Sequence, residues 1–251
     1  SQLQFMAGYH GLYCCNRSIC MWRGHELFVS SLPLLVEYIP ATLFYFLTPT
    51  VISLVLGALI CRVRVGKKNP LYWLVSLLVS FFRGTPGLVQ IYIVFFGLPK
   101  LFEPFGININ RWDAGIFYII ATCCNFSSFV SEAFRGAYEA IDKDQIEAGY
   151  SIGYSRWQCF CHVIAPLTMQ IALPNLKNLE IDLLKGTATA YVIGVVDVMG
   201  RADKIIAQHR GYGQIWILLA AAIIYFLINV VIELVFNSLT RHYSRHERGI
   251  A

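Results

Sequence analysis

Long apolar segments, separated by short polar ones, run along almost the whole chain. An α-helix rises about 1.5 Å per residue, so crossing a membrane takes about 20 predominantly apolar residues. These apolar runs are continuous rather than alternating, and they are too long for the strands of a membrane β-barrel. The pattern therefore predicts an all-α, polytopic membrane protein with about five transmembrane helices, at residues 32–61, 71–98, 112–134, 163–199 and 215–239.

The composition supports a membrane protein and excludes several other classes. Hydrophobic residues make up 57% of the chain and charged residues 14%, and the mean hydropathy is +0.56. Soluble domains carry about 25% charged residues. The net charge of +5 is modest, and no basic patch is interleaved with aromatic residues, so we expect no nucleic-acid partner. Residues 1–26 lack a charged segment followed by an apolar one, so no cleavable signal peptide is expected.

The eight cysteines do not define a framework. Cys123 and Cys124 lie inside an apolar run, which is typical of small core residues. A disulfide among Cys14, Cys15 and Cys20 stays open, although adjacent cysteines rarely bridge each other. No zinc spacing or HExxH motif occurs, so we expect no metal site.

The distribution of Lys and Arg predicts the topology. Ten positive residues fall after the first, third and fifth apolar segments, and seven fall on the opposite side. Basic residues favour the cytoplasmic side, so we expect the N-terminus outside and the C-terminus inside. The predicted organisation is an extracytoplasmic segment at 1–30, a transmembrane domain at 31–240 with a cytoplasmic loop at about 136–162, and a cytoplasmic tail at 241–251.

The cytoplasmic loop contains a polar, helix-forming stretch at residues 144–152. Gly149 and Gly153 are four residues apart, which clears one side of a helical turn for the close approach of another backbone. The alternative is an ordinary polar loop that ends in a glycine cap.

Four motifs resemble one transporter family, and they occur in its order and spacing across residues 30–240. Glu147-Ala148-Gly149, with Gly153 and then Ile164-Ala165-Pro166, resembles the EAA loop of bacterial ATP-binding-cassette (ABC) importer permeases. The other three motifs resemble the polar amino-acid branch of that family. They are Phe82-Arg83-Gly84-Thr85-Pro86-Gly87-Leu88-Val89-Gln90 with the later FGLP at 96–99, Asn125 with Glu132-Ala133-Phe134-Arg135-Gly136, and Leu183-Leu184-Lys185-Gly186-Thr187 with Val192-Ile193-Gly194.

This resemblance implies a mechanism and a set of partners. Glu147, Ala148, Gly149, Ile152 and Gly153 would form a coupling helix that docks on a separate ABC ATPase subunit. The solute pathway would lie between this chain and a second permease subunit, the same or similar, in the bacterial inner membrane and in contact with its lipid. An extracytoplasmic solute-binding protein would deliver the solute. The chain has no GxxxxGK[ST] motif, so ATP and Mg²⁺ would bind the partner, and this chain would not be an enzyme.

Charged residues interrupt the fourth apolar segment at Lys177, Glu180, Asp182 and Lys185. Charges at membrane depth are costly and usually pair or face a cavity. Lys177 with Glu180, and Asp182 with Lys185, are helical neighbours that could pair. In the alternative, Glu180 and Asp182 bind an ammonium or a cationic side chain, and Lys185 binds a carboxylate. Residues 180 and 182 point about 200° apart on an ideal helix, so both face one cavity only if the helix is broken.

Two further polar positions lie inside apolar segments. Gly84, Thr85 and Pro86 predict a kinked or re-entrant backbone in the second segment. We expect Arg83 to pair with Glu132 or another carboxylate rather than to bind the solute. Asn125 lies near the middle of the third segment, where it would either pack between helices or line the pathway.

These observations predict the permease subunit of an ATP-driven importer for polar amino acids, with a slight preference for basic amino acids or cystine. The pathway residues would be Asn125, Glu180, Asp182, Lys185 and Thr187, and Pro166 would close the EAA loop. The alternative is an ATP-independent secondary transporter or channel, although the two halves of the chain show no internal repeat.

Overall fold

The structure is a computed structural model that describes residues 17–66 and 68–245, with side chains from 25 to 241 apart from residue 67. Every regular element in this part of the chain is helical. Within the same residues, five helices are long and apolar enough to cross a membrane: Ile39–Val65, Gly87–Phe105, Ala114–Glu139, Arg156–Thr187 and Gln214–Arg241. The predicted all-α architecture with five spans is confirmed. The cysteines of the possible N-terminal disulfide lie outside the described side chains.

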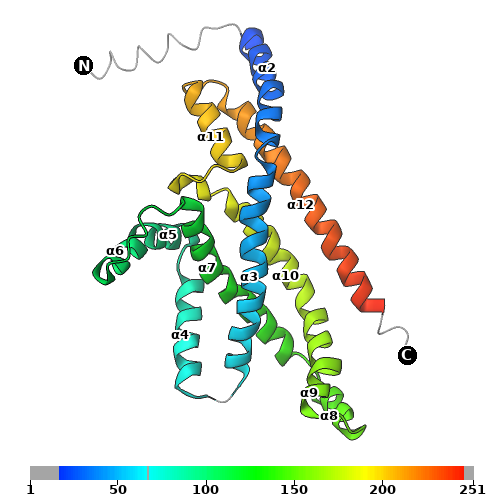
Figure 1. Ribbon diagram of the computed structural model, residues 1–251. Helices are drawn as coiled ribbons and strands as arrows, with labels where there is room; N and C mark the ends of the chain where they lie inside the picture. Colours follow the sequence, from blue (N-terminus) through cyan, green and yellow to red (C-terminus); the bar gives the residue numbers. More distant parts are fainter. Residues whose placement is uncertain (1–16, 67, 246–251) are drawn as a thin grey trace, which may run out of the picture.

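Apart from Gly87–Phe105, which runs sideways, the long helices run lengthwise between two ends of an elongated molecule (Figure 1). One end carries α2 (Arg17–Val36) and α11 (Val198–Gln208). The opposite end carries the turn between α3 (Ile39–Val65) and α4 (Pro70–Gly84), the paired short helices α8 (Lys143–Ser151) and α9 (Arg156–Cys159), and the last turns of α12 (Gln214–Arg245). The first and last described residues therefore lie at opposite ends, as an odd number of crossings requires.

The core is built around α3 and α7 (Ala114–Glu139), which pack along most of their length. Gly57 of α3 permits this approach, because a Cβ atom there would lie 2.5 Å from Cγ1 of Val130 on α7. Buried side chains of α10 (Ala165–Thr187) and α12 complete the same core. A second cluster joins α2, α11 and α12 at the end where the described chain begins.

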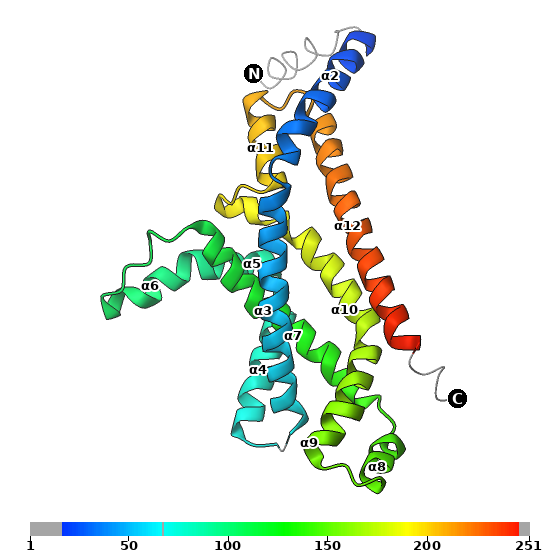
Figure 2. The ribbon, with the colours of Figure 1, turned by 45° about the vertical axis from the view of Figure 1, so that its right-hand side comes forward.

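The second apolar segment is bent, as the sequence predicts. The helix α4 ends at Gly84, and a new helical run begins at Gly87 with α5 (Gly87–Tyr92), continuing through a π-helical turn at Ile93–Gly97 and α6 (Leu98–Phe102) to Phe105. Figure 2 shows this second run turning sideways from α4 and projecting from the body of the molecule. Proline and glycine in the connection explain the break.

Both of the π-helical turns that the structure describes directly precede a proline motif. Ile93–Gly97 comes before Leu98 and Pro99, and Phe160–Ile164 comes before Ala165 and Pro166. Proline has no N–H for the helical ladder, and its ring crowds the preceding turn, which favours a widened turn there. Pro166 therefore marks the point where the α9 segment continues into α10.

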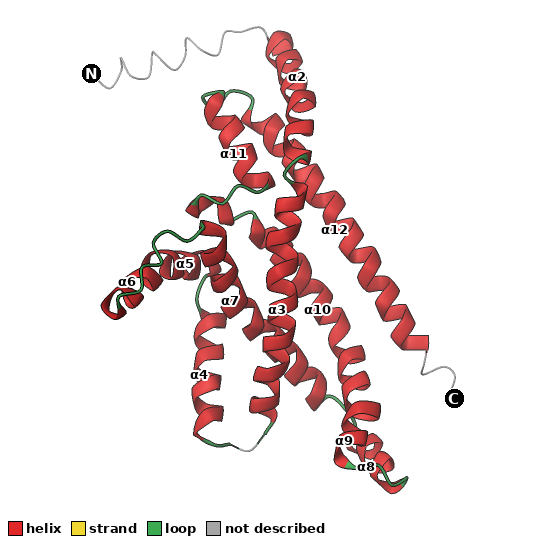
Figure 3. Cartoon of the chain, in the orientation of Figure 1, coloured by secondary structure: helices red, strands yellow, loops and turns green. Residues whose placement is uncertain are grey.

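Three predicted spans have wrong boundaries. The second was predicted at residues 71–98, but the long apolar helix is Gly87–Phe105, and α4 is a separate, shorter helix. The fourth helix ends at Thr187 rather than near residue 199. A 3₁₀ turn at Ala190–Ile193 follows, and Gly194 then adopts a φ of +91°. The chain continues into α11, and Asp197 caps the N-terminus of that helix. The first span begins at Ile39 rather than near residue 32, because the chain breaks at residues 37–38 and Pro40 starts a new helix. The predicted spans were too long because hydropathy does not detect these turns, which separate neighbouring helices in the structure (Figure 3).

Candidate functional site

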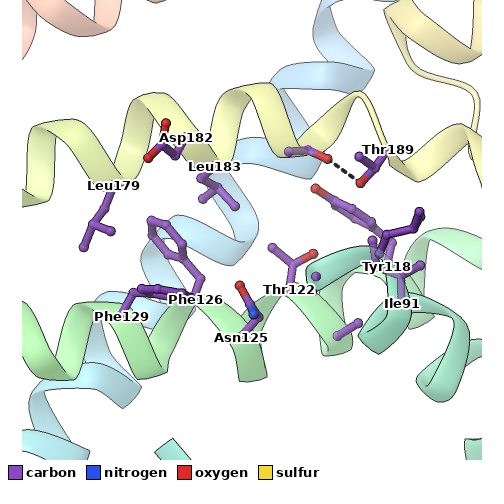
Figure 4. A pocket seen from close by; sticks show the side chains of 14 residues that line it. Ile91, Tyr118, Thr122, Asn125, Phe126, Phe129, Leu179, Asp182, Leu183 and Thr189 are labelled. Carbon is purple, nitrogen blue, oxygen red and sulfur yellow. Dashed lines mark hydrogen bonds between the residues drawn. The ribbon is translucent and has the colours of Figure 1, made fainter. Parts of the chain in front are cut away.

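The broken second span faces a cavity of about 340 Å³ between α5, α7 and α10. Figure 4 shows side chains of α7 and α10 facing each other across it. Asn125 lines it from α7 and Asp182 from α10. The lining residues are Gly87, Leu88, Ile91, Tyr118, Ala121, Thr122, Asn125, Phe126, Phe129, Leu179, Asp182, Leu183, Gly186 and Thr189. Asp182 is the one ionisable acid or base among them apart from the Tyr118 phenol, so the cavity carries a single carboxylate in a mixed apolar and polar wall.

One face of α10 is polar and exposed although the helix lies within a span. Asn175, Asn178, Asp182 and Lys185 are all exposed and recur three or four residues apart, which places them on one side of the helix. Asp182 and Lys185 pair with each other, with 3.4 Å between Oδ1 and Nζ, so this predicted pair is confirmed.

The pairing of Lys177 with Glu180 is wrong. Lys177 Nζ instead lies 3.5 Å from Oε1 of Glu233 on α12. Glu180 points into the protein, is 2% exposed, and accepts a 2.7 Å hydrogen bond from the Thr50 hydroxyl of α3. Glu180 and Asp182 thus leave α10 in different directions, as an unbroken helix requires, and Asp182 alone reaches the cavity.

The remaining candidate pathway residues are placed differently from one another. Thr187 is fully buried and its hydroxyl donates to the Leu184 carbonyl, so it lies off the cavity lining. Lys185 lies beside the cavity through its pair with Asp182 but does not line it. Asn125 and Asp182 are the two candidates that the structure brings to the cavity wall.

A cluster of ion-paired side chains (the ion cluster) joins α3, α4 and α7 around Glu132. Arg64 Nη1 lies 2.5 Å from Oε2 of Glu132, and Arg83 Nη1 lies 3.8 Å from the same oxygen, which confirms the predicted pair of Arg83 with Glu132. Arg135 contacts Oε1 of Glu132 and also pairs with Glu139. The guanidinium of Arg83 also stacks over the ring of Phe129, 5.6 Å from its centre. The cluster holds three helices together with one carboxylate at its centre.

The end formed by α8 and α9 is a small packed unit with an exposed apolar surface. Gly149 is buried, and a Cβ atom there would lie 3.3 Å from Cys159 Sγ and Val163 Cγ2 of this same chain. Gly153 adopts φ of +89° and follows the helix end, which is the conformation of a glycine cap. Glu147, Ala148 and Ile152 are exposed. Tyr150, Ile152, Trp157 and Phe160 form the exposed apolar surface of this unit.

A buried polar cluster fixes α11 to the spans at the opposite end of the molecule. Asp197 is 0% exposed and accepts hydrogen bonds from Tyr225 Oη at 2.7 Å and from the Gly200 amide at 2.8 Å. The Thr42 hydroxyl accepts from the Val198 amide. Burial raises the pKa of the Asp197 carboxyl above its ordinary value, and these hydrogen bonds partly offset that effect.

The sequence did not single out Gln90 as a site residue in its own right. Its amide fills the gap in the broken span, bonding to backbone oxygens of Phe82 and Thr85. A hydrogen bond from a side chain to the backbone produces no charge pattern or residue spacing that a sequence could show. The signal that was present is a glutamine inside an apolar segment, shortly after the helix-breaking Thr85-Pro86. Among residues 17–66 and 68–245, no group of three His, Cys, Asp or Glu side chains could hold a metal ion.

Residues 50–245 match the family described as "Binding-protein-dependent transport system inner membrane component". The chain belongs to this family and is therefore a multi-pass permease component of the inner membrane. It is 34% identical over 201 residues to the "Probable amino-acid ABC transporter permease protein PatM" of Vibrio harveyi, which covers 80% of this chain and 87% of that protein. It is 31% identical to the "L-cystine transport system permease protein TcyL" of Bacillus subtilis, covering 87% and 90%.

A solved structure described as "Crystal structure of an amino acid ABC transporter with histidines" has the same fold, with a TM-score of 0.73 and 28% identity over 85% of this chain and 96% of that one. The predicted class, the permease subunit of an ABC importer of the amino-acid branch, is confirmed by these matches. The alternative of an ATP-independent carrier disagrees with membership of a binding-protein-dependent family.

Proposed function

We propose that this chain forms the solute pathway of an ATP-driven importer of polar amino acids, along the polar face of α10 and the cavity beside it. The observation that carries the proposal is the exposed row of Asn175, Asn178, Asp182 and Lys185 within a membrane span. Charged side chains within a membrane span are costly against lipid and usually face water or pair with other protein groups, so such a face belongs against water or another protein. A second permease subunit, the same or similar, would cover this face and enclose the pathway.

The cavity chemistry supports a solute that carries positive charge. Asp182 supplies a carboxylate that would exchange its 3.4 Å pair with Lys185 for an ammonium or a guanidinium of the solute. Asn125 supplies a neutral polar group on the opposite wall. This pattern fits polar amino acids with a slight preference for basic ones. Cystine, with two ammonium groups, fits as well and is the solute named for the TcyL relative.

The α8–α9 unit is the proposed coupling site. Glu147, Ala148 and Ile152 are exposed at the end of the molecule, together with Tyr150 and Trp157, and an apolar surface of this kind suits a protein partner. Gly149 and Gly153 would act indirectly, by letting α8 pack against its own chain and by ending the helix. The ABC ATPase subunit that docks here would bind ATP and Mg²⁺ and carry out the hydrolysis.

The proposed orientation places the α8–α9 end in the cytoplasm. The helix ends and the turn that lie at this end of the molecule (Figure 1) carry basic residues, as the cytoplasmic side of a membrane protein favours. They are Arg62 in the last turn of α3, Lys68 in the turn before α4, Lys143 and Arg156 at the starts of α8 and α9, and Arg241 near the end of α12. The end with α2 and α11 would then face outward, where an extracytoplasmic solute-binding protein delivers the solute.

Uptake measurements test the pathway. The complex is purified from native membranes through a tag on this chain, reconstituted into vesicles and supplied with ATP, and uptake of labelled arginine, cystine and glutamine is followed. We expect Asp182→Asn to raise the apparent KM at least about tenfold for the transported solute, because a charged hydrogen bond is lost. Asp203→Asn, exposed on α11, is the matched control and should leave uptake unchanged. Equal KM values for both variants would reject Asp182 as a solute contact.

Co-purification tests the coupling site separately. Ile152→Arg places a charge on the exposed apolar surface and should remove the ATPase subunit from the purified complex. Gln208→Arg, on the opposite end, should retain it. Retention of the ATPase by Ile152→Arg would place the docking surface elsewhere.

A further inference from the structure

The break in the second span creates a hydrogen-bonding deficit inside the membrane. The helix α4 ends at Gly84 and α5 starts at Gly87, with Pro86 between them. A helix end leaves its last carbonyl groups without intrahelical donors, and lipid supplies none. Broken backbone at this depth therefore persists only where other groups of the protein satisfy it.

Two side-chain amides donate hydrogen bonds to the carbonyl groups at the break. Gln90 Nε2 lies 2.8 Å from the Phe82 carbonyl, 3.0 Å from the Thr85 carbonyl and 2.6 Å from Thr85 Oγ1. Asn125 Nδ2 donates to the same Phe82 carbonyl and to Gln90 Oε1, both at 3.1 Å. The Thr85 hydroxyl closes the network by donating to the Phe81 carbonyl at 2.9 Å.

The network reaches from α5 to α7 and borders the cavity. Gln90 is 3% exposed and does not line the cavity, whereas its neighbours Gly87, Leu88 and Ile91 do. Asn125 lines the cavity, and Figure 4 shows its oxygen directed across the opening toward α10. These bonds therefore join α5, which forms one wall of the cavity, to α7, which forms another.

We propose that Gln90 and Asn125 form an amide clamp that holds the broken span against α7, seals the break against water and keeps the cavity in the shape that the solute fits. The inference rests on the proposed function, since it assigns the clamp to the solute pathway. Gln90 is a positioning residue, because it acts through the backbone of residues 82–85 and through Asn125. Asn125 combines positioning with an oxygen that faces the pathway.

The test uses the reactivity of a cysteine placed at Leu88, on the cavity wall. Leu88→Cys is introduced into the assembled complex in native membranes, and labelling by a membrane-impermeant thiol reagent is timed with and without transported amino acid. The same complex without Leu88→Cys gives the background from the natural cysteines. Each measurement is repeated with Gln90→Met, which keeps the side-chain volume but removes the amide, and with Gln208→Met as a control on exposed surface.

We expect Gln90→Met to label at least about fivefold faster, because unsatisfied carbonyl groups draw water into the break. Solute should slow the labelling in the parent and fail to do so in Gln90→Met. Asn125→Leu leaves all three Gln90 contacts to the break in place, and should raise the rate about twofold. If Gln90→Met does not assemble, the labelling rates of Asn125→Leu and the parent are compared in the same way.

Equal labelling rates in the parent and the clamp variants would overturn the clamp. The proposed function fails in a different way: solute would not protect Leu88→Cys even with Gln90 intact, although the rate would still respond to Gln90→Met. The double variant Gln90→Met with Asn125→Leu should label faster than Gln90→Met. The added increase in rate should be smaller than the increase that Asn125→Leu causes alone, because both amides donate to the Phe82 carbonyl.

Discussion

Removing the carboxylate at the centre of the α3–α4–α7 ion cluster should destabilise the protein strongly. Glu132→Gln keeps the size of the side chain but leaves Arg64, Arg83 and Arg135 without their shared counter-ion. The side chains of Arg64 and Glu132 are 13% and 21% exposed, so water compensates only partly for the loss. Three guanidinium groups would then face one another with a single remaining carboxylate, Glu139, on Arg135.

The magnitude follows from the contacts. A hydrogen bond to a charged group contributes about 1.5–3 kcal/mol, and Glu132 receives two close ones, from Arg64 and Arg135. The Arg83 contact at 3.8 Å and 43% exposure adds little. Two contacts at the lower end of the range give a loss of about 3 kcal/mol in the free energy of unfolding.

Glu139→Gln is the matched control, because Glu139 pairs with Arg135 alone and its side chain is 58% exposed. We expect that variant to lose about 0.5 kcal/mol. Both variants are purified in the same detergent, and unfolding is followed by circular dichroism against a denaturing detergent. Equal losses in Glu132→Gln and Glu139→Gln would refute the view that Glu132 is the centre of the cluster.

Two further changes test packing and pH dependence. Gly57→Leu should lower the unfolding midpoint by the equivalent of about 1–3 kcal/mol, because its side chain would collide with Val130, whereas Gly136→Leu, with open space at its Cβ position, should have little effect. Because burial raises the pKa of Asp197, its contribution to stability is present below the ordinary aspartate pKa and is lost as pH rises through the raised pKa. Asp197→Asn should remove that part of the decline, measured as thermal unfolding at a series of pH values.

Much of the fold follows from hydropathy and from charge. Runs of about 20 apolar residues fix five spans because the membrane thickness sets their length. Arg83 and Glu132 could be paired in advance because charges at this depth require partners. The break at residues 84–86 follows from proline and glycine, whose effects are local.

The side-chain pairings that were predicted wrongly depend on contacts between segments that are distant in the sequence. Lys177 pairs with Glu233, 56 residues away on α12, rather than with its helical neighbour Glu180, and spacing along one helix cannot reveal that choice. Glu180 meets Thr50 on α3 for the same reason. Gly149 shows another kind of limit, because a small residue signals a close approach without saying which backbone approaches. In this chain Gly149 faces Cys159 and Val163.

The most direct test of the central claim is whether the polar face of α10 meets water. Asn178→Cys on this face and Phe226→Cys on the exposed apolar face of α12 are compared in the assembled complex, using a membrane-impermeant thiol reagent and the parent as background. We expect Asn178→Cys to react, its labelling rate to change when ATP hydrolysis is trapped, and Phe226→Cys to stay unlabelled in lipid. Two unlabelled positions, or a rate at Asn178→Cys that ignores the nucleotide, would contradict a solute pathway along α10.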